Sequence, residues 1–105
     1  HHMQKLVAFI GAGQMAEAMM AGMIKRKLII PPQILASGPR LERVNELRVK
    51  YGVQAFTNNS RAAKAADVLV LSLKPQLLNE VLASLGKLKP NALVISVVAG
   101  ATIAR

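Results

Sequence analysis

Gly11, Gly13 and Ala16 form a G-x-G-x-x-A turn between an apolar run at residues 6–10 and an apolar-faced segment at residues 15–24. A predicted strand before such a turn and a predicted helix after it are the context of a dinucleotide-binding β-α-β unit. The first glycine permits the tight turn, the second lets a pyrophosphate approach the backbone, and the small third residue lets the helix lie close to the strand. The N–H groups at the start of the helix then face the phosphates. The alternative is a β-α turn that needs only flexible residues.

The residues that follow the second predicted strand bear on which dinucleotide fits. Chains that prefer NAD normally carry Asp or Glu here, to bind the ribose 2′-hydroxyl. This chain instead has Ser37, Gly38, Pro39 and Arg40. No carboxylate would repel a 2′-phosphate, and the planar guanidinium of Arg40 could bind one. The sequence therefore favours NADP (NADPH) over NAD, although Pro39 and Arg40 also suit the start of the next helix.

Apolar strands alternate with helical patterns along the chain. Gly52 is expected to end the second helix, and Asn59 or Ser60 to cap the third. The predicted strands are residues 6–10, 34–37, 53–57, 68–73 and 93–98. The helical residues expected to face the core, from their spacing, are Met15, Met19, Met23, Ile24, Leu41, Val44, Leu47, Leu77, Leu78, Val81, Leu82 and Leu85.

This alternation predicts an α/β fold, a doubly wound parallel sheet of the Rossmann type with three α/β/α layers and strand order 3-2-1-4-5. Ligands of such sheets bind at the carboxyl ends of the strands, across the switch point between strands one and four. Three segments meet there: the glycine turn, residues 72–75 and residues 97–100. Lys74 and Pro75 also suit an ordinary helix start, but their place beside the crevice favours contact with a ligand.

Composition limits the other functions. The 105 residues, 52% of them hydrophobic, fit one small domain. With no cysteine there is neither a disulfide nor a thiolate nucleophile, and we expect a cytoplasmic protein. His1 and His2 resemble the remnant of an expression tag, so the domain is expected at residues 3–105, without a histidine for metal binding or proton transfer. No apolar run approaches the roughly 18 residues of a membrane span, so no membrane association is expected.

The formal net charge of +9, from 14 basic and 5 acidic residues, raises the alternative of a nucleic-acid-binding domain. The basic residues are scattered, however, and the aromatic residues are only Phe9, Tyr51 and Phe56. Platforms on which bases could stack are lacking, so nucleic-acid binding is not expected. Salt-dependent retention of DNA without affinity for a dinucleotide would favour the alternative.

Five segments together resemble Δ1-pyrroline-5-carboxylate reductases: residues 9–19, 36–39, 52–53, 66–76 and 94–103. The most specific are Lys-Pro-Gln at residues 74–76 and the Ile-Ser-x-x-Ala-Gly-x-Thr-Ile pattern at residues 95–103, both of which generic Rossmann domains lack. The resemblance implies an enzyme that reduces pyrroline-5-carboxylate to L-proline with NAD(P)H, in the last step of proline biosynthesis. In this family the substrate site and the dimer interface belong to a carboxyl-terminal helical domain.

We therefore interpret the chain as the amino-terminal piece of a longer homo-oligomeric enzyme. The piece alone is expected to be inactive. Its carboxylates are single, and most are expected at helix surfaces, so no catalytic residue is assigned: they are Glu17, Glu42, Glu46, Asp67 and Glu80. The resemblance implies cofactor contacts in three groups: the pyrophosphate at Ile10, Gly11, Ala12, Gly13, Gln14 and Met15; the adenosine side at Ser37, Gly38, Arg40 and Asn59; and the nicotinamide side at Ser72, Leu73, Lys74, Pro75, Val97, Val98 and Ala99.

Two other functions remain alternatives on the sequence. One is a reductase of similar architecture, such as a β-hydroxyacid dehydrogenase, whose missing half would carry a lysine base. The other is a regulatory module that binds the dinucleotide without turning it over. Assaying the full-length protein for reduction of pyrroline-5-carboxylate separates both from the main interpretation.

Overall fold

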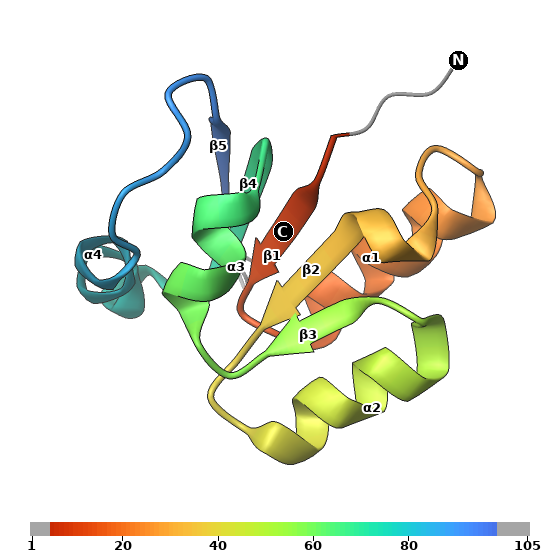
Figure 1. The fold of residues 1–105 in the computed structure, drawn as a ribbon. Helices are drawn as coiled ribbons and strands as arrows, with labels where there is room; N and C mark the ends of the chain where they lie inside the picture. The colour runs from red at the N-terminus through yellow and green to blue at the C-terminus, as the bar shows by residue number, and fades with distance from the viewer. Residues whose placement is uncertain (1–4, 99–105) are drawn as a thin grey trace, which may run out of the picture.

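The computed structural model describes residues 5–98, and it contains the predicted sheet. Five parallel strands lie in the order β3-β2-β1-β4-β5 (Figure 1). The strands are β1 (Val7–Ile10), β2 (Ile34–Ser37), β3 (Gln54–Phe56), β4 (Val68–Leu73) and β5 (Leu93–Val98). The helices are α1 (Gln14–Lys25), the 3₁₀ turn η1 (Pro31–Gln33), α2 (Leu41–Tyr51), α3 (Asn59–Ala65) and α4 (Pro75–Ser84). The expected tag remnant at residues 1–2 and the expected cofactor residue Ala99 lie outside the described residues.

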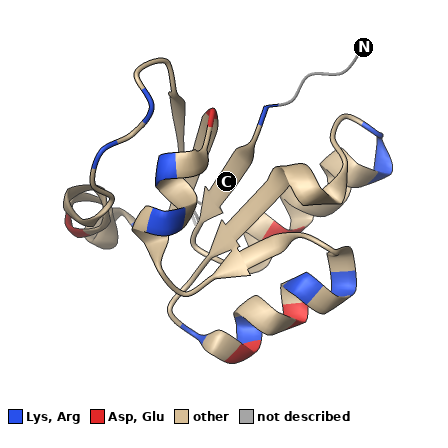
Figure 2. Cartoon of the chain, in the orientation of Figure 1, with Lys and Arg blue, Asp and Glu red and all other residues tan. Residues whose placement is uncertain are grey.

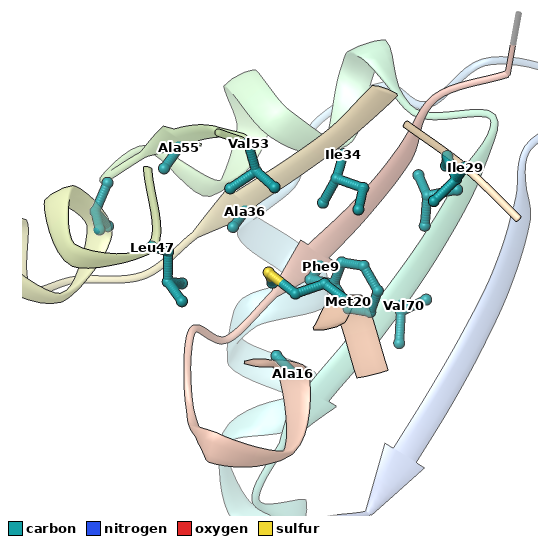
Figure 3. Close-up of a cluster of buried hydrophobic side chains, with 12 residues drawn as sticks. Phe9, Ala16, Met20, Ile29, Ile34, Ala36, Leu47, Val53, Ala55 and Val70 are labelled. Atoms are coloured by element: carbon teal, nitrogen blue, oxygen red, sulfur yellow. The ribbon is translucent and has the colours of Figure 1, made fainter. Parts of the chain in front are cut away.

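Strand β1 lies at the centre of the sheet and is buried along its whole length. Its residues alternate between two apolar clusters, because successive side chains of a strand point to opposite faces. Phe9 packs with Met20 of α1 and Leu47 of α2 on one face (Figure 3). Ile10 packs with the alanines of α3 and with Leu85 on the other face. Helices α1 and α2 thus cover one face and α3 and α4 the other, which gives the predicted three layers (Figure 1).

The buried stripe of α1 lies one residue away from the predicted one. Ala16 and Met20 are fully buried, whereas Met15 is only half-buried. Met19, Met23 and Ile24 pack against the edge of the same cluster. The prediction is therefore confirmed for Met19, Met23 and Ile24 and wrong for Met15, and it missed Ala16 and Met20, the most buried residues of the helix.

Four further local predictions were wrong at helix positions. Leu41 is 62% exposed because it is the first residue of α2, and Leu77 and Leu82 are each 42% exposed on α4. Asn58, not Asn59 or Ser60, caps α3: its backbone is extended, and its Oδ1 accepts a hydrogen bond from the Arg61 N–H at 3.1 Å. The prediction for Gly52 is confirmed, since this residue ends α2 with a left-handed φ of 78°.

Asp67 connects the chain at the starts of three strands, β1, β4 and β5. Its Oδ2 accepts a hydrogen bond from the Leu6 N–H at 2.8 Å, and its own N–H donates to the Leu6 carbonyl at 2.8 Å. The Leu93 N–H donates to the Asp67 carbonyl at 2.9 Å, and Lys89 pairs with the carboxylate at 3.1 Å. The Leu6 N–H, followed by Lys89, lowers the pKa of Asp67. Asp67 therefore fixes the amino-terminal edge of the sheet, opposite the candidate site.

Strand β5, at one edge of the sheet, carries exposed apolar side chains. Leu93, Val94 and Ile95 of β5 are 57%, 42% and 41% exposed. Beside them, an apolar groove of about 560 Å³ runs between α1 and the adjacent face of β1, β4 and β5. Within residues 5–98, no helix has the length and apolar character needed to cross a membrane.

Two glycine substitutions are predicted to change stability in opposite directions. Gly52→Ala places a side chain at a φ of 78°, which L-residues disfavour, and should lower the free energy of unfolding by about 1 kcal/mol. Gly22→Ala lies inside α1, where a Cβ meets nothing within 4 Å, and should raise that free energy by about 0.5–1 kcal/mol. Urea unfolding of both variants beside the unsubstituted chain measures the two signs. Equal effects would show that backbone conformation does not decide them.

Candidate functional site

The glycine turn connects β1 to α1 and packs directly on β4. Gly11 has a φ of 104°, and its N–H donates to the Ser37 carbonyl at 2.9 Å. A Cβ added to Gly11 would collide with the Ser72 carbonyl oxygen. A Cβ added to Gly38 would lie only 2.9 Å from the Cβ of Ala12. Both glycines therefore let the turns after β1 and β2 lie close to their neighbours, as the motif predicts for Gly11.

Gly13 has a different role from Gly11. It is the N-cap of α1, where it has extended backbone and provides no capping side chain. The first N–H groups of a helix have no acceptor within the helix, so those of α1 are left for another partner. A Cβ at Gly13 would meet nothing within 4 Å. Packing within the described chain does not require a glycine here, whereas close approach of a ligand to this backbone would.

A pocket of about 530 Å³ opens between this helix start and α2, and its volume is typical of small-molecule sites. It brings together residues predicted from two separate motifs, the first turn and the turn after β2. The residues that line it are Ala12, Gly13, Gln14, Glu17, Gly38, Pro39, Arg40, Arg43 and Glu46. Among residues 5–98, no group of three or more His, Cys, Asp or Glu is arranged to hold a metal ion.

Arg40 stands at the rim of the pocket. Its side chain is 75% exposed and lies 3.8 Å from Glu42, which is 89% exposed. An ion pair this exposed is worth little, so the guanidinium can leave it at small cost. Arg40 is therefore free to reach a phosphate group in the pocket.

Ser37 and Asn59, predicted for the adenosine side, contact each other. Ser37 is fully buried at the end of β2, and its hydroxyl donates to Asn59 Oδ1 at 2.7 Å. Asn59 is the first residue of α3. The structure thus brings both residues to the carboxyl edge of the sheet.

The residues predicted for the nicotinamide side lie on β4, β5 and the start of α4. Ser72 pairs with Val97, and Leu73 pairs with Val98, in the parallel ladder. Lys74 is exposed at the N-cap of α4, and Pro75 follows as the first residue of that helix. Because Gly11 packs on Ser72, this group adjoins the glycine turn.

Sequence reasoning missed Arg43, which connects α2 to the glycine turn. Its Nε donates to the Ala12 carbonyl at 2.7 Å, and its Nη2 donates to the Gly13 carbonyl at 3.2 Å. Nη2 also pairs with Glu17 at 2.7 Å, and Nη1 pairs with Glu46 at 3.2 Å. The sequence analysis had counted Arg43 among scattered basic residues, and Figure 2 shows such residues spread over α2, α3 and the loops.

Glu17 is a partly buried centre of interactions, which corrects its assignment as a single surface carboxylate. Its side chain is only 17% exposed, and besides Arg43 it accepts from the Tyr51 hydroxyl at 2.6 Å and from Lys50 at 2.9 Å. Tyr51, then Lys50, then Arg43 lower the pKa of Glu17 from 4.5 to about 2. Arg43 and Lys50 are seven residues apart, about two helical turns, and this spacing could have shown that both lie on one face of α2.

Residues 6–100 match the protein family described as NADP oxidoreductase coenzyme F420-dependent. The chain belongs to this family. It is 39% identical over 101 residues to pyrroline-5-carboxylate reductase 1 of Bacillus subtilis, a match that covers 94% of this chain and 34% of that protein. The pyrroline-5-carboxylate reductase structure from Coxiella burnetii has a TM-score of 0.77 at 30% identity, and the match covers 93% of this chain and 37% of that one.

A more distant solved structure is pyrroline carboxylate reductase of Plasmodium falciparum with NADP bound, which has a TM-score of 0.75 at 22% identity and shows the fold alone. The match covers 90% of this chain and 33% of that one. The chain therefore spans about a third of the length of these relatives. The Rossmann fold and the resemblance to pyrroline-5-carboxylate reductases are both confirmed, and the two alternative functions are not favoured.

The Glu17 contacts predict a specific loss of stability in acid. Because folding lowers the pKa of this carboxyl to about 2, its stabilising effect is present above its ordinary pKa of 4.5 and is lost as the pH falls toward 2. Glu17→Gln should therefore destabilise the chain near neutral pH, and the difference from the unsubstituted chain should shrink between about pH 5 and pH 2. Urea unfolding across this range measures the difference, with Glu80→Gln, at an exposed position of α4, as the matched control. A constant difference would contradict the prediction.

Proposed function

We propose that this chain is the NADP(H)-binding domain of an enzyme that reduces 1-pyrroline-5-carboxylate to L-proline. One observation carries the proposal: a pocket of about 530 Å³ lies at the uncapped start of α1, between the G-x-G-x-x-A turn and Arg40. The 39% identity to the Bacillus subtilis reductase supports the choice of substrate. Residues 3–105 are proposed as the domain.

The proposed role of the domain is to bind and orient the dinucleotide. The open space at Gly13 would let a pyrophosphate reach the N–H groups of α1. The residues present therefore fit the pyrophosphate of a dinucleotide. When bound, the cofactor supplies a hydride for the imine carbon of the substrate. Ser72 to Pro75 and residues 97–99 form the proposed nicotinamide side, where the rigid β4–β5 pairing would fix the position of the ring.

The remaining steps are assigned to the rest of the protein. The chain spans about a third of its relatives, so we place the substrate site and a homo-oligomeric interface in the part beyond it. No residue of this chain is proposed to be catalytic. The absence of cysteine from the 105 residues is compatible with the proposed cytoplasmic location.

NADP(H) is proposed as the preferred cofactor. The support is the sequence after β2, where Ser37, Gly38 and Pro39 provide no carboxylate to bind a ribose 2′-hydroxyl or to repel a 2′-phosphate. Arg40 lines the same pocket with an exposed guanidinium, which could accommodate the 2′-phosphate.

The function is tested first by binding and then by turnover. The 105-residue chain should bind NADPH but form no proline, and Gly13→Val should lose binding while it keeps its fold, since its Cβ meets nothing within 4 Å. Fluorescence titration and circular dichroism measure the two properties. The full-length protein should convert pyrroline-5-carboxylate and NADPH to proline. Proline formation by the short chain alone, or none by the full-length protein, would overturn the proposal.

Arg40→Asp tests the cofactor preference. Loss of a charge-assisted contact with the 2′-phosphate should weaken NADPH binding roughly tenfold or more, at about 1.4 kcal/mol per decade, and leave NADH nearly unchanged. Titrating both cofactors against both proteins separates the outcomes. Equal losses of NADPH and NADH affinity would mean that Arg40 supports the fold or the electrostatic field around the pyrophosphate. An unsubstituted chain that prefers NADH would contradict the proposed preference for NADP(H).

A further inference from the structure

Arg43 uses its whole guanidinium to connect α2 to the glycine turn. Nε and Nη2 bond the carbonyls of Ala12 and Gly13, two successive residues of the turn. Nη2 and Nη1 pair with the carboxylates of Glu17 and Glu46. The side chain is 19% exposed, and its contacts with Ala12 and Glu17 are partly buried, whereas those with Gly13 and Glu46 are exposed. Arg43 thus bonds the two carbonyls that precede the first N–H groups of α1.

The hydrogen bond to Ala12 orients the peptide plane between Ala12 and Gly13. The bond to Gly13 adds to the helical bond that this carbonyl already accepts from the Glu17 N–H at 3.0 Å. In a trans peptide the C=O of one residue and the N–H of the next point in opposite directions, and no cis peptide is present among the described residues. With the Ala12 and Gly13 carbonyls turned toward Arg43, the N–H groups of Gly13 and Gln14 point away from it. A carbonyl oxygen repels a phosphate and an N–H attracts one, so this orientation decides whether the turn can accept an anion.

The charge of Arg43 is already matched. Glu17 and Glu46 lie 2.7 and 3.2 Å from its nitrogens, whereas Arg40, on the same pocket, has only a loose and exposed partner. Lys50 and Tyr51 hold the other oxygen of Glu17 and so keep that carboxylate in place against Arg43. Arg43 is therefore placed to hold the turn, while Arg40 is placed to bind a ligand.

We propose that Arg43 is a positioning residue for the dinucleotide, which holds the glycine turn with its carbonyls turned away and its N–H groups presented to the pyrophosphate. The inference rests on the proposed function and deepens it. The pyrophosphate is common to NADPH and NADH, so Arg43 serves both cofactors equally. Arg40, in contrast, would distinguish them.

The test measures the dissociation constants of NADPH and NADH for two variants of the chain. Arg43→Met removes every hydrogen bond and should weaken both cofactors by about tenfold or more, with their ratio unchanged. Arg43→Lys keeps the charge beside Glu17 but lacks the planar fork that reaches both carbonyls, and it should show a smaller loss for both cofactors. Arg26→Met, at the exposed far end of α1, is the matched control and should bind as the unsubstituted chain does. Thermal unfolding confirms that each variant is folded.

Several results would overturn the inference. A loss confined to NADPH would make Arg43 a ligand of the 2′-phosphate, and full recovery in Arg43→Lys would mean that charge alone matters. Unchanged affinities for NADPH and NADH would mean that Arg43 only stabilises the fold. If Arg43→Met does not fold, Arg43→Lys decides between these outcomes by itself. Failure of the unsubstituted chain to bind either cofactor would instead overturn the proposed function, so the two failures are distinguishable.

Discussion

The packing of Gly11 on the Ser72 carbonyl, which leaves no room for a Cβ, is the constraint on which the site depends. It places the turn after β1 directly on β4, the strand across the switch point of the sheet. The turn after β2 joins the same cluster, because Gly38 packs on Ala12 and Ser37 accepts from Gly11. The loops after β1, β2 and β4 are thereby held close together by contacts of the backbone. Such contacts do not change when side chains change rotamer.

Much of this arrangement could be predicted from the sequence. The strand order, the parallel sheet and the φ > 0 role of Gly52 follow from periodicity and from the few residues that permit left-handed backbone. The pocket between the first two turns was also predictable, because the carboxyl ends of parallel strands lie at one edge. These features depend on local sequence patterns or on general rules of α/β topology.

What escaped prediction depends on contacts between distant segments. Arg43 and Glu17 are 26 residues apart, and nothing in either helix alone shows that they pair. Composition presented Arg43 as one of 14 basic residues and Glu17 as one of 5 acidic residues. The buried stripe of α1 was misplaced for a related reason: Ala16 is too small to stand out in a hydrophobic pattern, yet it touches the sheet. Arg40 and Arg43 show this limit of prediction from sequence. They are only three residues apart at the start of α2, yet Arg40 is exposed and Arg43 is held by its partners.

The hydrogen bonds of Asp67 have a consequence for how the chain acquires its structure during synthesis. The Leu6 N–H finds its acceptor 61 residues later, and the Asp67 carbonyl in turn accepts from Leu93. The central strand, β1, precedes the other four in the chain, so it remains without one neighbour until β4 has emerged. Local helices can form early, but closure of these long loops sets the pace of the sheet. The order of synthesis therefore differs from the order of the strands in space, and the nascent chain has to keep β1 unpaired on one side until β4 has been added.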